Sequence, residues 1–342
     1  MKIDFPHKQS AHCENGVVAN LMRFQGYDFD EPMVFGIGSG IFYSYFPFIK
    51  MNGIPVVSYR ILPGAIFKRF TERIGVKIES HTYSSIPKAM QELDTMLDKG
   101  VPVGMLTSVF YLSYLPDAYR FHFNAHNIVV YGKEGTEYLV SDPVMDYTTR
   151  IAADDLIRAR FAKGVAEPKG KMYFPIILPK EYDLEKAIWK GIKRASYDMT
   201  EIPIPIFATK GMRYLAHRMR HWHQTLGEKK AIQYLGNVVR MQEEIGTGGA
   251  GFRFIYAAFL DKASKIVNDN ELFELSKQLT ATGDKWRNFA YYAGRVCKSR
   301  KTDLLSFAEL GDIIMQCADE EEKIFCRLLQ IARKHDRSFV YI

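Results

Sequence analysis

The chain of 342 residues is poor in cysteine and in long apolar runs. Its four cysteines include no C-x-x-C pair, which argues against zinc ribbons and dithiol redox motifs. No uninterrupted apolar run approaches the roughly 18 residues of a membrane-spanning helix. The first residues also show no apolar core of signal-peptide length. We therefore expect a cytoplasmic protein that needs no metal or redox cofactor and has no membrane partner.

The composition is that of a globular protein, with 47% hydrophobic and 25% charged residues. The net charge of +7 is unevenly spread. Residues 1–150 contain 14 basic and 15 acidic side chains, whereas the rest contains 32 and 24. This bias would attract an anionic partner or simply favour solubility. Because no nucleic-acid-reading module is recognisable, we expect no nucleic-acid partner. Homo-oligomerisation remains open.

The length favours two domains, and the pattern of elements changes near residue 180. Before that point, helical periodicities alternate with β-rich segments, which predicts an α+β domain over 1–180. After it, almost every segment has helical periodicity, which predicts an all-α domain over 181–342. The predicted helices are 14–25, 64–74, 86–98, 152–162, 183–197, 208–224, 227–244, 250–267, 269–280, 282–298, 303–318 and 319–335, and the predicted strands are 101–106, 126–131, 137–141 and 173–179.

Cys13 stands where the first predicted helix begins, followed by Glu-Asn-Gly. A thiol at a helix start lies close to unpaired backbone N–H groups and to the positive end of the helix dipole, which favours the thiolate. The same N–H groups can donate to an oxyanion that develops on a substrate carbonyl. Cys13 is therefore the candidate nucleophile, although a lone cysteine is more often only a small buried side chain.

His126 opens a predicted strand, and Asp142 follows the second strand of the same hairpin. Residues at the outer ends of two adjacent antiparallel strands can be neighbours. Asp142 could then hold one imidazole nitrogen while the other faces Cys13, which is the arrangement of a nucleophile, its base and the residue that orients the base. The order Cys, His, Asp is that of papain-like cysteine enzymes, so we predict this fold for 1–180.

Three further residues are weaker candidates. Gln9 could donate to the oxyanion, although papain-like enzymes usually place a glutamine further ahead of the cysteine. Ser39 lies in a glycine-rich loop that would let the backbone approach a substrate closely. Arg253 follows the glycine cluster 246–251, where a nest of N–H groups could hold an anion. Each of these segments could equally be an ordinary loop or turn.

Several of these segments together resemble a known family. Residues 12–16, 31–40, 110–114 and 126–142 look like the N-terminal domain of butirosin biosynthesis protein H, and 246–260 resembles the helical domain of unknown function that often follows it. The resemblance implies a papain-like fold with Cys13 as the acylated thiol, His126 as the base and Asp142 as its orienter. The tyrosines of the 110–114 motif, Tyr111 and Tyr114, would then be substrate-binding residues.

The family's namesake moves an acyl group from a carrier-protein thioester to an amine. The resemblance thus implies a thioester donor, on an acyl carrier protein or coenzyme A, and a small amine acceptor. Family members often carry an acidic residue shortly before the tyrosine motif, where this chain has residues 107–109 without one, so its acceptor can differ. A peptidase or amidase with the same residues, and a non-catalytic binding protein of the same fold, remain alternatives.

Overall fold

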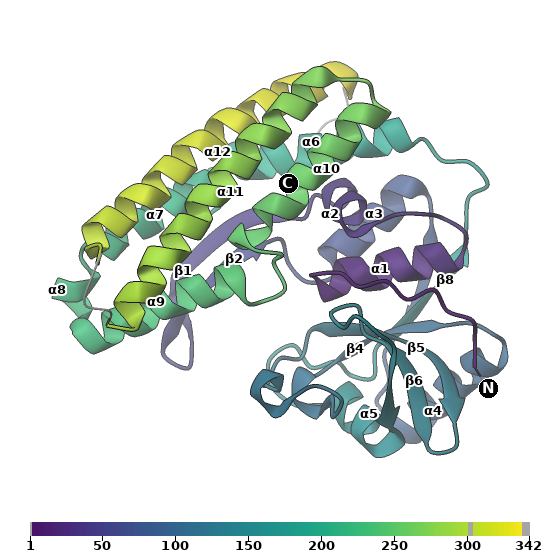
Figure 1. Cartoon of the computed structure of the whole chain (residues 1–342). Coiled ribbons are helices and arrows are strands. Elements are labelled where there is room, and N and C mark those ends of the chain that lie inside the picture. Colours follow the sequence, from purple (N-terminus) through teal and green to yellow (C-terminus); the bar gives the residue numbers. More distant parts are fainter. Residues whose placement is uncertain (1, 300–303, 337–342) are drawn as a thin grey trace. The chain divides into compact units, whose positions relative to one another are not determined.

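The computed structural model describes residues 2–299 and 304–336 (Figure 1). By its internal contacts the chain forms two compact units, the first of Met1–Val34 with Thr71–Tyr182 and the second of Phe35–Phe70 with Asp183–Ile342. The predicted fold class, an α+β part followed by a helical part, is confirmed by the elements. The main difference from the predicted ranges 1–180 and 181–342 is that Phe35–Phe70 belong to the second unit.

The first unit is built on a six-stranded sheet in which the paired strands run antiparallel, in the order β3-β8-β4-β5-β6-β7. His126 begins β5 and is paired with Thr107, the last residue of β4. These positions place the candidate base at one end of the sheet. The strands are β3 (Lys77–His81), β4 (Val103–Thr107), β5 (His126–Glu134), β6 (Glu137–Ser141), β7 (Thr149–Ala152) and β8 (Met172–Ile177).

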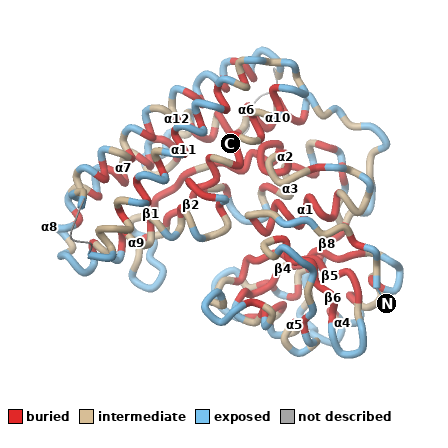
Figure 2. The backbone as a smooth tube through the Cα atoms, in the orientation of Figure 1, coloured by how far each residue is buried: buried red, intermediate tan, exposed pale blue. Residues whose placement is uncertain are grey.

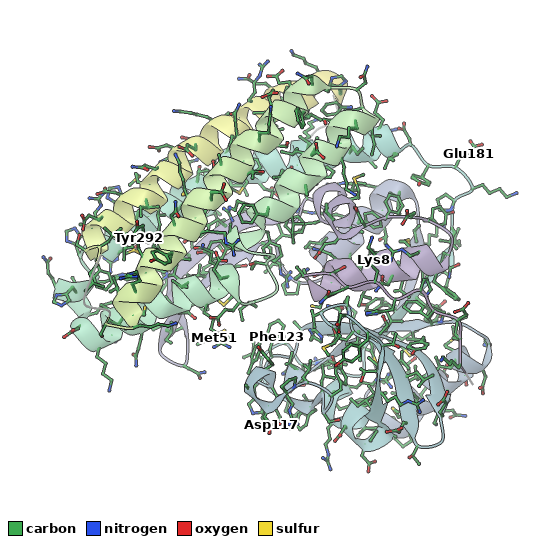
Figure 3. The ribbon with its side chains drawn as sticks, in the orientation of Figure 1. Lys8, Met51, Asp117, Phe123, Glu181 and Tyr292 are labelled. Atoms are coloured by element: carbon green, nitrogen blue, oxygen red, sulfur yellow. The ribbon has the colours of Figure 1, made fainter. Side chains whose placement is uncertain are left out.

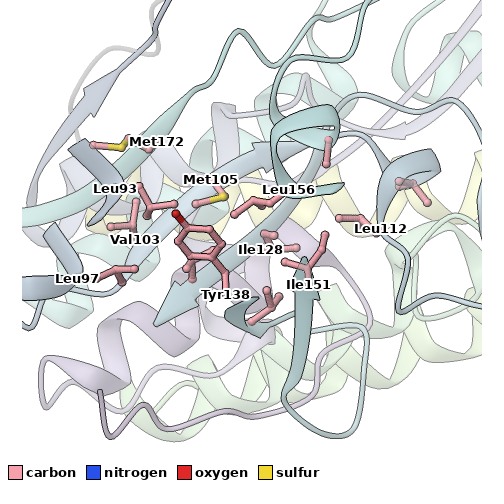
Figure 4. Close-up of a cluster of buried hydrophobic side chains, with 14 of the residues drawn as sticks. Leu93, Leu97, Val103, Met105, Leu112, Ile128, Tyr138, Ile151, Leu156 and Met172 are labelled. Carbon is pink, nitrogen blue, oxygen red and sulfur yellow. The ribbon is translucent and has the colours of Figure 1, made fainter. Parts of the chain in front are cut away.

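Helices cover both faces of this sheet (Figure 1). On one face, α4 (Ile86–Asp98) and α5 (Ala153–Arg160) close an apolar core. Figure 4 shows this core, whose members include Leu93, Leu97, Val103, Met105, Leu112, Ile128, Tyr138, Ile151, Leu156 and Met172. On the other face, α1 (Cys13–Phe24) packs against β5, and the strand is buried for most of its length (Figure 2). The unit also contains the short helices η1 (Val109–Tyr111) and η2 (Asp117–Tyr119).

The chain passes between the units inside two helices, α2 (Glu31–Ile37) and α3 (Ala65–Ile74). Between them lies a hairpin of β1 (Ile41–Met51) and β2 (Ile54–Arg60), which belongs to the second unit. Tyr43 and Tyr59 from this hairpin pack around the buried Trp286, with ring centroids 6.4 and 5.7 Å from the indole. This aromatic packing is the physical reason why 35–70 leave the first unit.

The remainder of the second unit is helical. Where two helices were predicted over 269–298, the structure has one, which continues through Gly283, a position that lies tight against the ring of Phe254. The last helix is likewise single, and residue 303, where a helix was predicted to start, lies outside the described residues. The helices are α6 (Leu184–Thr200), α7 (Ala208–Arg220), α8 (Trp222–Leu226), α9 (Glu228–Glu243), η3 (Ala250–Phe252), α10 (Arg253–Ile266), α11 (Asn270–Cys297) and α12 (Phe307–His335).

Arg253, a predicted anion-binding residue, is fully buried in this unit. Its Nε and Nη2 donate to the two carboxylate oxygens of Glu321, both at 2.8 Å, and its Nη1 donates to the Gly251 carbonyl at 2.7 Å. Trp286 Nε1 also donates to Glu321 at 2.7 Å. The guanidinium is thus occupied by a structural ion pair, which leaves it no exposed surface on which to hold a ligand.

This ion pair gives a testable prediction. Arg253→Met should destabilise the protein by about 3–5 kcal/mol, because Glu321 would be left as a buried charge without its partner. Arg213 pairs with Asp319 and Glu322 at a partly exposed position, so Arg213→Met should cost at most about 1 kcal/mol. Urea denaturation of both variants measures the difference. A double variant, Arg253→Met with Glu321→Leu, should recover much of the loss, and equal stability of the two single variants would contradict a structural role.

Candidate active site

Cys13 is the first residue of α1 and is 8% exposed. The first helical hydrogen bond that reaches back to the cap runs from the Gly16 N–H to the His12 carbonyl, at 2.9 Å. The N–H groups earlier in this turn have no acceptor within the helix, as at every helix start. The thiol therefore lies beside backbone donors of the kind that stabilise a thiolate or an oxyanion.

The segment before Cys13 is fixed by hydrogen bonds from several sides. The carboxylate of Glu31, at the start of α2, accepts from the backbone N–H of Ala11 at 2.8 Å and of His12 at 2.7 Å. Asn20, in α1, donates its side-chain amide to the Lys8 carbonyl at 3.0 Å, and Figure 3 shows Lys8 alongside this helix. Burial raises the pKa of the Glu31 carboxyl, although its N–H partners oppose this. Hydrogen bonds from α1 and α2 thus hold the backbone segment that leads to Cys13.

Gly16 brings the first turn of α1 close to the turn after β6. A Cβ at this position would lie 2.4 Å from the Cβ of Pro143 and 2.7 Å from that of Ser10. Pro143 directly follows Asp142, and its carbonyl accepts the Ser10 N–H at 2.7 Å. Glycine at 16 therefore permits the close approach that sets the position of Cys13 relative to the Asp142 turn.

A second prediction follows from this approach. Gly16→Ala should destabilise the protein by about 1–3 kcal/mol, as overpacking does in tight contacts, although alanine normally favours a helix. Gly294 in α11 is the matched control, because nothing lies within 4 Å of its added Cβ. Gly294→Ala should leave stability unchanged or raise it by up to about 1 kcal/mol. Thermal denaturation measures both variants, and a Gly16→Ala protein as stable as the wild type would refute the argument.

His126, Asp142 and Cys13 lie together in the first unit. The Nε2 of His126 donates to Asp142 Oδ2 at 2.8 Å, and the imidazole is also hydrogen-bonded to the thiol of Cys13. Since Nε2 is used by the carboxylate, Nδ1 is the nitrogen left for the sulfur. Thr107 Oγ1 donates to the His126 carbonyl at 3.1 Å and steadies the start of β5. The sequence-predicted nucleophile, base and orienter are thus in contact.

The surroundings favour the charged form of His126. Burial, the largest influence, disfavours the imidazolium, but the negative charges of Asp142 and Cys13 and hydrogen bonds to both outweigh it. The pKa of His126 is therefore raised well above its usual value. This environment supports a thiolate–imidazolium pair, which is the reactive form of a cysteine nucleophile.

Two tyrosines complete the site. Tyr114, predicted as a substrate-binding residue, donates its hydroxyl to Asp142 Oδ2 at 2.9 Å, so it anchors the carboxylate that holds His126. Tyr173 in β8 was not predicted as a site residue. Burial and the nearby charges of Glu14 and Cys13 raise its pKa well above the usual value. Only the strand order places Tyr173 beside the site, and no local motif signals it.

The other predicted residues lie as follows. Gln9 is exposed, and its side-chain amide is 3.5 Å from the Val144 carbonyl, so its oxyanion role stays a prediction. Tyr111 is half-buried against the apolar core and Phe110. Ser39 belongs to the second unit, where it is fully buried and donates its hydroxyl to the Gly191 carbonyl at 2.9 Å. Ser39 and Arg253 therefore have structural partners in that unit.

The connection between β4 and β5 is rich in aromatic side chains and leads directly into His126. Phe110 and His122 stack with ring centroids 4.0 Å apart, and Phe121 and Phe123 are 6.1 Å apart. Figure 3 labels Asp117 and Phe123 on this connection. The Val109 N–H donates to the Phe123 carbonyl at 2.9 Å and closes the loop. Aromatic side chains thus precede the base in the chain, and Tyr111, Phe121 and Phe123 among them pack against the apolar core.

In the described ranges 2–299 and 304–336, no group of three or more His, Cys, Asp and Glu side chains is placed to hold a metal ion. None of the helices in these ranges combines the length and apolar character that a bilayer crossing requires.

A helix that begins with a thiol, packed on an antiparallel sheet that supplies a histidine and an aspartate, defines the papain-like class of cysteine enzyme folds. The family model of butirosin biosynthesis protein H, N-terminal, matches residues 12–143, and the model of the domain of unknown function DUF4872 matches residues 154–328. The chain belongs to the DUF4872 family, with a butirosin biosynthesis protein H-like N-terminal part.

A comparison with solved structures finds a protein assigned as a C39-like peptidase from Bacillus anthracis, with 15% identity and a TM-score of 0.36. The match covers 53% of this chain and 100% of the other. Curated proteins give no match.

Proposed function

We propose that the protein is a cysteine-dependent acyltransferase, which moves an acyl group from a thioester to a small amine through an acyl-enzyme on Cys13. The donor would be a thioester of an acyl carrier protein or of coenzyme A. The observation that supports this proposal is the hydrogen-bonded series Cys13–His126–Asp142 at the start of α1. The match of residues 12–143 to the model of butirosin biosynthesis protein H, N-terminal, is a second support, because the resemblance to that family implies acyl transfer.

In the first half-reaction, the Cys13 thiolate attacks the thioester carbonyl, and backbone N–H groups at the start of α1 stabilise the oxyanion. Collapse of this intermediate breaks the bond between carbonyl carbon and donor sulfur. The leaving thiolate takes a proton from the His126 imidazolium. The products are an acyl group on Cys13, a free donor thiol and a neutral imidazole.

In the second half-reaction, an amine attacks the acyl-enzyme, and neutral His126 accepts the proton that the nitrogen loses. The bond to the Cys13 sulfur breaks and regenerates the thiolate beside the imidazolium. Asp142 keeps the imidazole oriented and stabilises its charged form throughout, and Tyr114 holds Asp142.

Hydrolysis by the same residues, with water as the acceptor, is the alternative. The aromatic connection before His126 favours transfer, because aromatic side chains in the segment that leads into the base would limit the access of water. A protein that binds a ligand without catalysis is a third reading, and the contact between Cys13 and His126 weighs against it.

The test uses the whole chain with an acyl thioester and an excess of a primary amine. The background variant Cys326→Ser removes an exposed thiol that could be acylated without catalysis. We expect an acyl adduct on the Cys13 peptide by mass spectrometry and more amide than free acid among the products. Free acid as the main product would replace transfer by hydrolysis. An adduct spread over several cysteines, with no turnover, would remove the enzymatic proposal.

A further inference from the structure

A cavity of about 500 Å³ lies at one end of the sheet in the first unit. Its walls come from the loops that follow β3 and α5 and precede β8, with Tyr83, Ser84, Phe161, Lys163, Glu167 and Lys169 among the lining residues. The volume falls within the roughly 300–1,000 Å³ of small-molecule sites. Neither the proposed mechanism nor the family resemblance uses this cavity.

Three of the lining side chains are charged, the cationic Lys163 and Lys169 and the acidic Glu167. The Lys163 ammonium is 3.6 Å from a carboxylate oxygen of Glu167, which offsets part of its charge. Lys169 is exposed, and no carboxylate in residues 2–299 and 304–336 forms an ion pair with it. One positive charge at the rim is therefore not compensated locally.

A second positive charge lies behind the wall. Arg160 is fully buried, and its guanidinium donates to the neutral carbonyls of Ala89 at 3.2 Å and Gly170 at 3.0 Å. Its Nε has no hydrogen-bond partner, and within the described part of the chain no carboxylate pairs with the group. Burial lowers its pKa to about 10, so the group stays charged at neutral pH. Arg160 directly precedes Phe161 in the chain, and Gly170, to which it donates a hydrogen bond, directly follows Lys169. Its charge therefore lies close to the cavity, and burial leaves it weakly screened.

The wall also offers planar apolar surface. Two aromatic residues, Tyr83 and Phe161, line it together with Thr82 and Ser84. The Tyr83 N–H donates to the Lys169 carbonyl at 2.8 Å, which joins the aromatic and cationic sides. An inorganic anion alone would fill little of this volume.

We propose that this cavity binds a nucleoside monophosphate or an organic anion of the same chemistry, with the phosphate at Lys163 and Lys169 and the aromatic base against Tyr83 and Phe161. Asn124 donates its amide to the carbonyls of Lys163 at 3.2 Å and Val165 at 3.0 Å. Since Asn124 lies just ahead of His126, the site is joined to the segment that positions the candidate base.

Calorimetric titration of the whole chain with adenosine 5′-monophosphate tests this proposal, with adenosine and inorganic phosphate as separate titrants. We expect saturable binding of the nucleotide in the millimolar range or tighter. Adenosine and phosphate should each bind at least about tenfold more weakly, because each has only one of the two recognised parts. The double variant Lys163→Glu with Lys169→Glu should lose nucleotide binding.

Lys77→Glu is the matched control, because Lys77 is exposed at the opposite end of β3 from the cavity. It should bind the nucleotide like the wild type, and circular dichroism should show that both variants are folded. No saturable binding by the wild type, or equal binding by the folded double variant, would overturn the proposal. Cys13→Ala should bind as the wild type does, which separates this site from the acyl chemistry.

Discussion

Alanine in place of Cys13 is expected to reduce acyl transfer by at least about a thousandfold, because the loss of the nucleophile leaves only binding and oxyanion stabilisation. The acyl adduct should disappear from the intact protein at the same time. The geometry supports this size of effect, since the sulfur at the start of α1 is hydrogen-bonded to an imidazole that is itself held by a carboxylate.

Cys326→Ala is the control for this experiment. Cys326 is exposed and would react with thioesters in free solution, but it lies in α12 and belongs to the second unit, whereas His126 belongs to the first. Its loss should leave turnover unchanged. A Cys13→Ala protein that retains transfer, with an adduct on another residue, would show that the nucleophile lies elsewhere.

Asp142→Asn is expected to lower turnover by roughly 10²- to 10⁴-fold. In the wild type, the charges of Asp142 and Cys13 hold the pKa of His126 well above its usual value despite burial. The imidazolium is therefore present below that raised pKa, and as the pH rises through it the imidazolium is lost and with it the thiolate–imidazolium pair. Removal of the carboxylate charge lowers the pKa of His126, so the alkaline limb of the pH–rate profile should move to lower pH.

The matched control for this change is Asp146→Asn, in the same turn but at an exposed position. It should leave both the rate and the pH profile unchanged. Iodoacetamide labelling of Cys13 across the pH range provides a second measurement that needs no substrate. Identical profiles for wild type and Asp142→Asn would mean that the carboxylate does not set the charge of His126.

The sequence was sufficient to predict that Cys13, His126 and Asp142 lie together. Cys13 was placed at a helix start by local periodicity, and His126 and Asp142 were placed by the turn between β5 and β6. Each inference used only short-range signals and one rule of antiparallel pairing. Strand limits were also close, since the segment predicted over 137–141 is β6 as observed.

Interactions between distant segments could not be predicted in the same way. Tyr173 reaches the site because β8 inserts between β3 and β4, and nothing local to it reports this order. Arg253 was interpreted as an anion site because its partner, Glu321, lies 68 residues further along the chain. The β1–β2 hairpin was missed although its Asn52-Gly53 turn is a typical hairpin signal, because the aromatic run before it hid the alternation.

Phe35–Phe70 belong to the second unit but lie within the first unit in the sequence, which affects the order in which the chain can fold during translation. This segment leaves the ribosome well before its partners from Asp183 onward, including Trp286. Its hairpin must therefore remain without its aromatic neighbours while more than half of the polypeptide is still being made. The second unit can complete its fold only once the helices from Asp183 onward have emerged.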